Sequence, residues 1–194
     1  HRDPVYKPLS KDADLRQRQG AGKIVAETSQ GKPVEILLED NSARMNHAMG
    51  EAAADLTQDL DTQLGPVDRG GLLVAASLWR RLLLAGPQRY GEVYYLGTAP
   101  LPFGEPLKNH ADVIVGTHDV SETRFLFDPA TGHMLGLEMF PAPHTDPCEM
   151  YFDDFRDTDA GLLPHRWEIR HGDRVYDVLK IKAFDLPPVA KEEA

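Results

Sequence analysis

The sequence predicts an α+β protein in which one strongly curved antiparallel sheet holds two helices in its concave face. Short β-favouring runs fill both ends of the chain, between residues 22 and 47 and again after Pro87. Runs typical of helices occur only between them, from residue 51 to residue 85. Because short turns join the strand runs, we expect neighbours in sequence to pair antiparallel. Two helices cannot cover both faces of such a sheet, so we place them together on its concave side.

The N-terminal strands come first. GKIVAETS (22–29) and PVEILLED (33–40) favour strands, and the turn residues Gln30, Gly31 and Lys32 between them predict a hairpin. Residues 44–47 continue the pattern as a third strand. The stretch from Glu51 to Gln63 is rich in Ala, Leu and Asp and has no β-branched run. It therefore predicts a first, modest helix.

The clearest helix is expected from Asp68 to Ala85. Asp68 can cap its first turn, and Gly86 followed by Pro87 ends it. One apolar stripe recurs at spacings of three and four residues, a pattern typical of a helix that buries one face. The stripe consists of Leu72, Ala75, Ala76, Trp79 and Leu83.

The remainder predicts strands joined by turns. Asp128-Pro129-Ala130-Thr131-Gly132 is a strong hairpin signal, because Pro129 presets one turn angle and Gly132 accepts a positive φ. His171-Gly172-Asp173 joins the last two strands. The strand-like runs are RYGEVYYLGTAPL (89–101), DVIVGTHD (112–119), ETRFLFD (122–128), HMLGLEMF (133–140), EMYFDDFRD (149–157), PHRWEIR (164–170) and RVYDVLKIKAFDL (174–186), with a polar loop FGEPLKNH (103–110) after the first.

The N-terminal end of the chain is predicted to be a polar tail or linker, and the C-terminal end a polar tail. Residues 1–19 contain two prolines and at most one helical turn, near Asp12 to Gln19, and residues 187–194 form a polar C-terminal tail. A single domain is expected over residues 20–186. Because the chain begins with His1 rather than Met, we expect a segment upstream of it to have been removed.

Composition excludes several classes of function. The 194 residues carry 21 Lys and Arg against 31 Asp and Glu, a formal net charge of −10. This balance argues against a nucleic-acid partner, because phosphate binding needs a concentrated basic surface. The single Cys148 excludes an intramolecular disulfide and a Cys-only zinc site. The apolar stretch from residue 70 to 84 contains Arg80 and Arg81 and is too short to span a bilayer.

The order of motifs in the C-terminal half resembles the LolA-like family of bacterial lipoprotein carriers, over roughly residues 88–186. The motifs are a Y-x-x-x-x-Y-L-G strand (Tyr90 to Gly97), a D-P-x-T-G hairpin (Asp128 to Gly132), a Y-F-x-D-F-R strand (Tyr151 to Arg156) and the link from Asp159 to His165. The resemblance implies a half-open β-barrel whose helices close a hydrophobic cavity for acyl chains or lipoproteins in the cell envelope. A long helix before the first strand is missing here, and Ala160 replaces the usual Gly, which favours a divergent member.

The large apolar side chains of the predicted interior are the residues that could line a cavity for an acyl chain. From the residues alone a solid core is expected, because protein interiors pack densely, and the resemblance makes a lined cavity an equal alternative. Leu179 and Ile181 share the expected concave face. The candidates for lining a cavity are Leu72, Trp79, Leu83, Tyr95, Phe125, Phe127, Met139, Trp167 and Ile169.

The polar clusters are interpreted as structural. His144, Asp146, Cys148 and Glu149 stand in one proline-bounded loop without separated ligand pairs, so no metal is expected there. The acidic run Asp153, Asp154, Asp157 and Asp159 is interpreted as a solvated strand edge. His118 and Asp119 are neighbours on a strand and point to opposite faces. The chain carries no G-x-S-x-G elbow, Walker loop, dinucleotide fingerprint or H-E-x-x-H motif, which argues against a hydrolase or a kinase.

Two functions follow as expectations. The first is a non-catalytic periplasmic or extracytoplasmic module that binds an acyl chain, a lipoprotein or another apolar ligand, without a cofactor. The alternative is an accessory or interaction domain of a longer secreted protein, such as a protease, with a protein partner and no ligand of its own. A metal-dependent hydrolase is a distant third.

Overall fold

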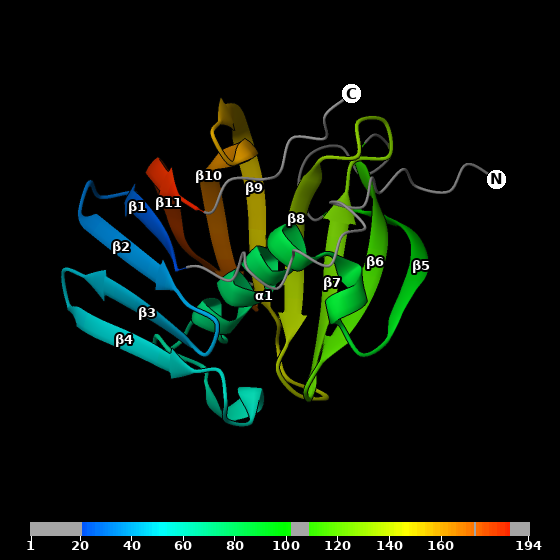
Figure 1. The fold of residues 1–194 in the computed structure, drawn as a ribbon, viewed down its shortest axis with the longest axis horizontal. Coiled ribbons are helices and arrows are strands. Elements are labelled where there is room, and N and C mark those ends of the chain that lie inside the picture. The colour runs from blue at the N-terminus through cyan, green and yellow to red at the C-terminus, as the bar shows by residue number, and fades with distance from the viewer. Residues whose placement is uncertain (1–20, 102–108, 173, 187–194) are drawn as a thin grey trace.

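In the computed structural model, eleven antiparallel strands of the described residues, which are 21–101, 109–172 and 174–186, form one open, curved sheet (Figure 1). The expected tails, and most of the expected loop 103–110, lie outside these ranges. The elements are β1 (Gly22–Glu27), β2 (Pro33–Leu38), β3 (Ser42–His47), β4 (Gly50–Asp55), η2 (Leu60–Thr62), α1 (Leu72–Ala85), η3 (Pro87–Arg89), β5 (Val93–Pro100), β6 (His110–His118), β7 (Ser121–Phe127), β8 (Met134–Phe140), β9 (Cys148–Thr158), β10 (Gly161–His171) and β11 (Arg174–Asp185).

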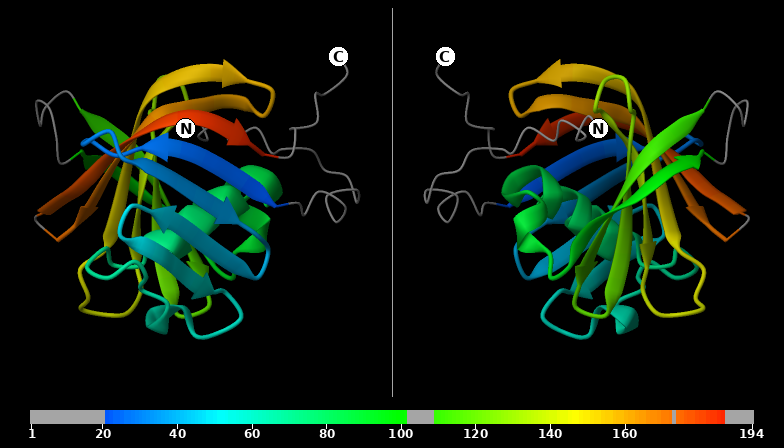
Figure 2. Two further views of the ribbon diagram at one scale, coloured as in Figure 1. Left: turned by 90° about the vertical axis from the view of Figure 1, so that its left-hand side faces the viewer. Right: turned by 90° about the vertical axis from the view of Figure 1, so that its right-hand side faces the viewer.

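The order of strands across the sheet is β4-β3-β2-β1-β11-β10-β9-β8-β7-β6-β5. Pairing of sequence neighbours is therefore confirmed, and the pairing of β1 with β11 joins the first and last strands of the described residues. The chain leaves one edge at β4 and resumes at the other edge with β5. The helix α1 makes this crossing within the concave side of the sheet (Figures 1 and 2). Its 14 residues span about 21 Å at 1.5 Å per residue.

Local turn chemistry places the strands as the sequence predicts. Gly31 has a φ of 73° between β1 and β2, and Gly132 has a φ of 74° between β7 and β8. The Asp128 carboxylate accepts the backbone N–H groups of Ala130 and Thr131 at 2.7 and 3.2 Å, which fixes that second turn. Each turn returns the chain beside the strand it has just left.

The prediction of a helix from Glu51 to Gln63 is wrong. Residues 50–55 form the edge strand β4, whose Ala52 lies opposite Met45 of β3 and whose Ala54 lies opposite Ala43. Ala54 is buried while its neighbours Ala53 and Asp55 are exposed, so the segment alternates as a strand does. Alanines fit the apolar spacing of a helix as well as that of a strand. Here pairing with β3 makes the segment a strand. Only the short 3₁₀ turn η2 follows, so the described chain holds one α-helix in the concave face where two were expected.

The start of α1 also differs from the prediction. The helix begins at Leu72 rather than Asp68, and its N-cap residue Gly71 has a φ of 94° and provides no side-chain cap. Asp68 itself has a φ of 64°, which is turn geometry. The expected end at Ala85 and Gly86 is confirmed. None of the residues of α1 is fully exposed, because the curved sheet and the segments before β5 surround it.

The main core lies between α1 and the concave face of the sheet. Trp167 and Ile169 of β10 point into it and are fully buried, whereas their neighbours Glu168 and Arg170 form an ion pair on the opposite face. This alternation was predicted from the sequence. No helix in the described part of the chain is long and apolar enough to cross a membrane.

Candidate functional site

The side chains expected to line a cavity mostly lie in the packed core. Tyr95 differs: it stands on the edge strand β5, is 52% exposed, and donates its hydroxyl to Asp112 at 2.9 Å. Leu83 and Phe127 are half-buried at the margin of the core. The remaining candidates are at most 1% exposed, and they are Leu72, Trp79, Phe125, Met139, Trp167 and Ile169.

Beneath α1 the interior is filled by aromatic rings. The Trp79 ring packs edge-on against Trp167 with the ring centroids 4.9 Å apart. Phe152 and Phe184 lie at 6.0 and 6.2 Å from the same indole. Such tilted and edge-on contacts are favourable ring geometries. The space between helix and sheet around Trp79 is therefore occupied by side chains of the protein itself.

A small apolar hollow lies where α1 ends. It is bounded by the end of the helix, the segment that follows and the concave face of β5, β6 and β7, and its lining residues are Leu82, Pro87, Tyr90, Val93, Ile114, Gly116, Phe125 and Phe127. Its volume is about 10 Å³. This is about the space that one water molecule needs, so an acyl chain does not fit without movement of these side chains.

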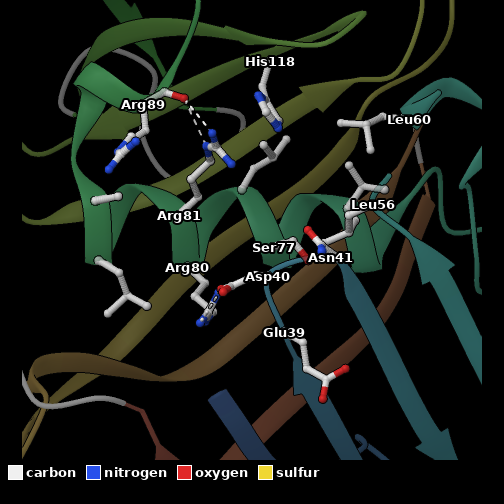
Figure 3. A pocket seen from close by; sticks show the side chains of 14 residues that line it. Glu39, Asp40, Asn41, Leu56, Leu60, Ser77, Arg80, Arg81, Arg89 and His118 are labelled. Atoms are coloured by element: carbon white, nitrogen blue, oxygen red, sulfur yellow. Dashed lines mark hydrogen bonds and ion pairs between the residues drawn. The ribbon is translucent and has the colours of Figure 1, made fainter. Parts of the chain in front are cut away.

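The larger of the two hollows is a groove of about 440 Å³ along α1 (Figure 3). Its lining residues Val74, Ser77, Leu78 and Arg81 recur on one face of the helix, opposite to Trp79. This volume lies within the range of small-molecule sites. We call it the α1 groove. Its apolar surface comes from the half-buried Leu56, Leu84 and Ala85, beneath which Leu60, Val74 and Leu78 are buried. Its polar lining consists of Glu39, Asp40, Asn41, Ser77, Arg80, Arg81, Arg89 and His118.

One wall of the α1 groove is acidic and internally neutralised. It comes from the turn between β2 and β3. The Glu39 carboxylate accepts the Ser42 hydroxyl at 2.5 Å and lies 3.4 Å from Arg44 Nη2, and these contacts hold the pKa of Glu39 below its usual range. Asp40 lies 3.4 Å from Nη1 of the buried Arg80, which reaches it from α1. Both carboxylates of this wall therefore already have cationic partners.

The opposite wall is basic and is built on α1, η3 and the end of β6. Arg81 donates from Nε and Nη2 to the Arg89 carbonyl oxygen at 3.1 and 3.0 Å, which fixes the plane of its guanidinium (Figure 3). His118 points toward the same guanidinium (Figure 3). Within the described ranges, neither the Arg81 nor the Arg89 guanidinium forms an ion pair.

The environment of His118 favours its neutral form. Burial lowers the pKa of His118 below its usual value, the positive charge of Arg81 lowers it further, and Asp119 opposes both. The ring also packs edge-on against Tyr90 at 6.3 Å between centroids. Asp119 itself accepts the Leu60 backbone N–H at 3.0 Å, which holds η2 against the groove. An anion placed between His118 and Arg81 would reverse the second of these effects.

Of the polar clusters found in the sequence, the loop around His144 and Cys148 and the acidic run from Asp153 to Asp159 lie outside this groove, whereas His118 lines it. Among the residues that the structure describes, no group of three or more His, Cys, Asp and Glu side chains could hold a metal ion. Cys148 is fully buried, and burial raises the pKa of its thiol. The acidic run lies where β9 has passed the end of β8 and pairs only with β10, and Asp154 forms an ion pair with Arg156 there.

The basic wall was missed by the sequence reasoning. In the sequence Arg81 only interrupts an apolar stretch, and Arg89 and His118 are 8 and 37 residues away from it. The sequence feature that could have indicated this wall is the pair of arginines inside an otherwise apolar helix, because a buried charge is normally paired. Which residues complete the wall depends on the crossing of α1 over the sheet.

Comparison with known proteins finds matches among solved structures. A scan against protein-family models finds no match, and a search of the curated proteins finds none. Among solved structures, a LolA superfamily protein from Nitrosomonas europaea matches with a TM-score of 0.49 and 10% identity, covering 89% of each chain. A domain described as that of an outer membrane lipoprotein-sorting protein from Vibrio parahaemolyticus matches with a TM-score of 0.42 and 10% identity, covering 92% of each chain.

Proposed function

We propose that the protein is a non-catalytic binding module of the cell envelope that holds an amphipathic ligand with an acyl chain in the α1 groove. The observation that carries this proposal is the groove itself, a hollow of about 440 Å³ with charged walls, beside which Leu56, Leu84 and Ala85 keep exposed apolar surface. The envelope placement follows the motif resemblance in the C-terminal half. The ligand position differs from the sequence expectation, because the space around Trp79 is already filled by Trp167, Phe152 and Phe184.

The binding energy would come from burial of hydrocarbon. Each methylene removed from water contributes about 0.8 kcal/mol. Leu56, Leu84 and Ala85 are half-buried at the groove, so their apolar surfaces can cover part of a chain. Polar groups along the groove would orient the polar end of the ligand.

The experiment is a titration with a fluorescent fatty-acid probe. Saturable binding of one probe per protein is expected, with a rise in thermal stability as the probe concentration increases. Ser77 is partly buried and lines the groove, so Ser77→Trp should fill it and weaken binding at least tenfold. Asn46→Trp, at an exposed position of β3 that does not line the groove, is the matched control. Absence of saturable binding, or equal binding by the two variants, would refute the proposal.

An accessory domain with a protein partner is the second candidate, and the edge strand β5 favours it. Val93, Tyr94, Tyr95 and Leu96 are consecutive there and between 40% and 53% exposed. An uncharged edge strand offers free backbone groups to an added strand. This candidate predicts that Tyr95→Lys abolishes complex formation with the partner while the fatty-acid probe shows no saturable binding.

A further inference from the structure

We infer that the α1 groove selects anionic amphiphiles, with a carboxylate or phosphate head group held between Arg81, Arg89 and His118. This inference rests on the proposed function, because it names the class of ligand for the same groove. It concerns the basic wall, which that function does not require.

The charges of the groove are balanced on one side only. On the acidic wall, Glu39 has Arg44 and Ser42 as partners, and Asp40 has Arg80. On the basic wall, Arg81 and Arg89 form no ion pair within the described ranges. The groove therefore carries uncompensated positive charge at one end.

This excess is unusual in a chain with a formal net charge of −10. Arginines elsewhere in the described chain are commonly paired, as Arg124 is with Glu122 and Arg166 with Glu168. The two unpaired guanidiniums line one groove, and the positive charge of Arg89 disfavours that of Arg81. A bound anion would offset this repulsion. An anion is the ligand whose charge complements this wall.

Arg81 is held in position before any ligand binds. Its two bonds to the Arg89 carbonyl oxygen use Nε and one hydrogen of Nη2. The two hydrogens of Nη1 and the second hydrogen of Nη2 remain as donors. A guanidinium fixed in this way loses little freedom when it binds, and its planar donor set matches the oxygens of a carboxylate or phosphate.

The position of the basic wall also sets the direction of the ligand. Arg81 and Arg89 lie toward the C-terminal end of α1, while Leu56 and Leu60 lie beside its N-terminal half (Figure 3). Along the helix, Arg81 and Val74 are separated by about 10 Å at 1.5 Å per residue. With its head group at the arginines, the ligand would lay its chain past Leu78 toward Leu56 and Leu60.

The test compares four ligands that share a twelve-carbon chain, titrated calorimetrically below their micellar concentrations. They are dodecanoate, dodecyl phosphate, dodecanol and dodecyltrimethylammonium. Either anion should bind at least tenfold more tightly than dodecanol, and the cation should bind most weakly. The order of dodecanoate and dodecyl phosphate identifies which head group is preferred. Inorganic phosphate alone should bind at least a hundredfold more weakly than dodecyl phosphate, and equal binding would contradict an amphiphile site.

Variants separate the head-group inference from the proposed function. Arg89→Gln and Arg81→Gln should each weaken dodecanoate binding at least threefold and together bring it to the level of dodecanol, whose own binding stays unchanged. Arg81→Lys keeps the charge if Arg81→Gln impairs folding, and Arg174→Gln, at an exposed arginine that does not line the groove, is the matched control. Equal binding of dodecanol and the anions overturns the head-group inference and leaves the proposed function standing. Failure of all four ligands to bind refutes both.

Discussion

Replacement of Trp79 by alanine tests whether the space beneath α1 is packed or hollow. The indole is 1% exposed and contacts the rings of Trp167, Phe152 and Phe184. Removal of a fully packed Trp costs about 3–5 kcal/mol, because the neighbours cannot close the void. The edge-on contact with Trp167 accounts for about 0.5–1.5 kcal/mol of such a loss. Since small proteins have a total stability of about 5–15 kcal/mol, the variant should lose a large share of it.

The assay is urea unfolding followed by circular dichroism. With an m-value of about 2 kcal/mol/M, a loss of about 4 kcal/mol lowers the midpoint by about 2 M. Trp79→Phe serves where the alanine variant does not fold. Tyr95→Ala is the control, because this side chain is half-exposed on β5 and should cost less than about 1 kcal/mol. A loss below about 1.5 kcal/mol for Trp79→Ala would show that the indole borders a void and refute the packed interior.

Three further outcomes follow from the described contacts. A Cβ at Gly136 would lie 2.5 Å from the Met150 carbonyl oxygen, so Gly136→Ala should cost about 1–3 kcal/mol in the same urea assay; a neutral effect would contradict the close approach of β8 and β9. The Cys148 thiol is buried and its pKa is raised, so a disulfide reagent should label it only in urea, and rapid labelling of the native protein would exclude this packing. Burial lowers the pKa of His118, so the unfolded chain binds a proton more readily and stability should fall as the pH drops from 7 to 5; His118→Gln should flatten this part of a melting-temperature profile, and an unchanged slope would argue against it.

Much of the fold could be predicted because its signals are local. The turn at Asp128 to Gly132 and the alternation around Trp167 each need only a few neighbouring residues. The same holds for the end of α1 at Gly86, where the chain loses its helical conformation. Hairpins joined in this way form a meander, and the pairing of neighbours follows from it.

Elements decided by distant partners could not be predicted. Residues 51–63 have the composition of a helix, but pairing with β3 makes 50–55 a strand. Tyr95 has the residue type of a core position, yet the edge of the sheet leaves it half-exposed. The contrast with Phe125, which is fully buried, arises from the position of each strand in the sheet rather than from either side chain.

The candidate site was the least predictable part. A resemblance to carriers directs attention to the large apolar residues, which the structure packs beneath α1. The α1 groove lies on the other side of the same helix, and Arg81, Arg89 and His118 meet there only because α1 crosses the sheet from β4 to β5.

A crystal structure with bromine-labelled dodecanoate tests the central claim most directly, since the anomalous signal of bromine locates the chain. We predict bromine density in the α1 groove near Leu56 and Leu60, with the carboxylate beside Arg81 and Arg89 and the Trp79 ring still packed on Trp167. Bromine density beneath α1, with the Trp79 and Trp167 rings moved apart, would contradict it.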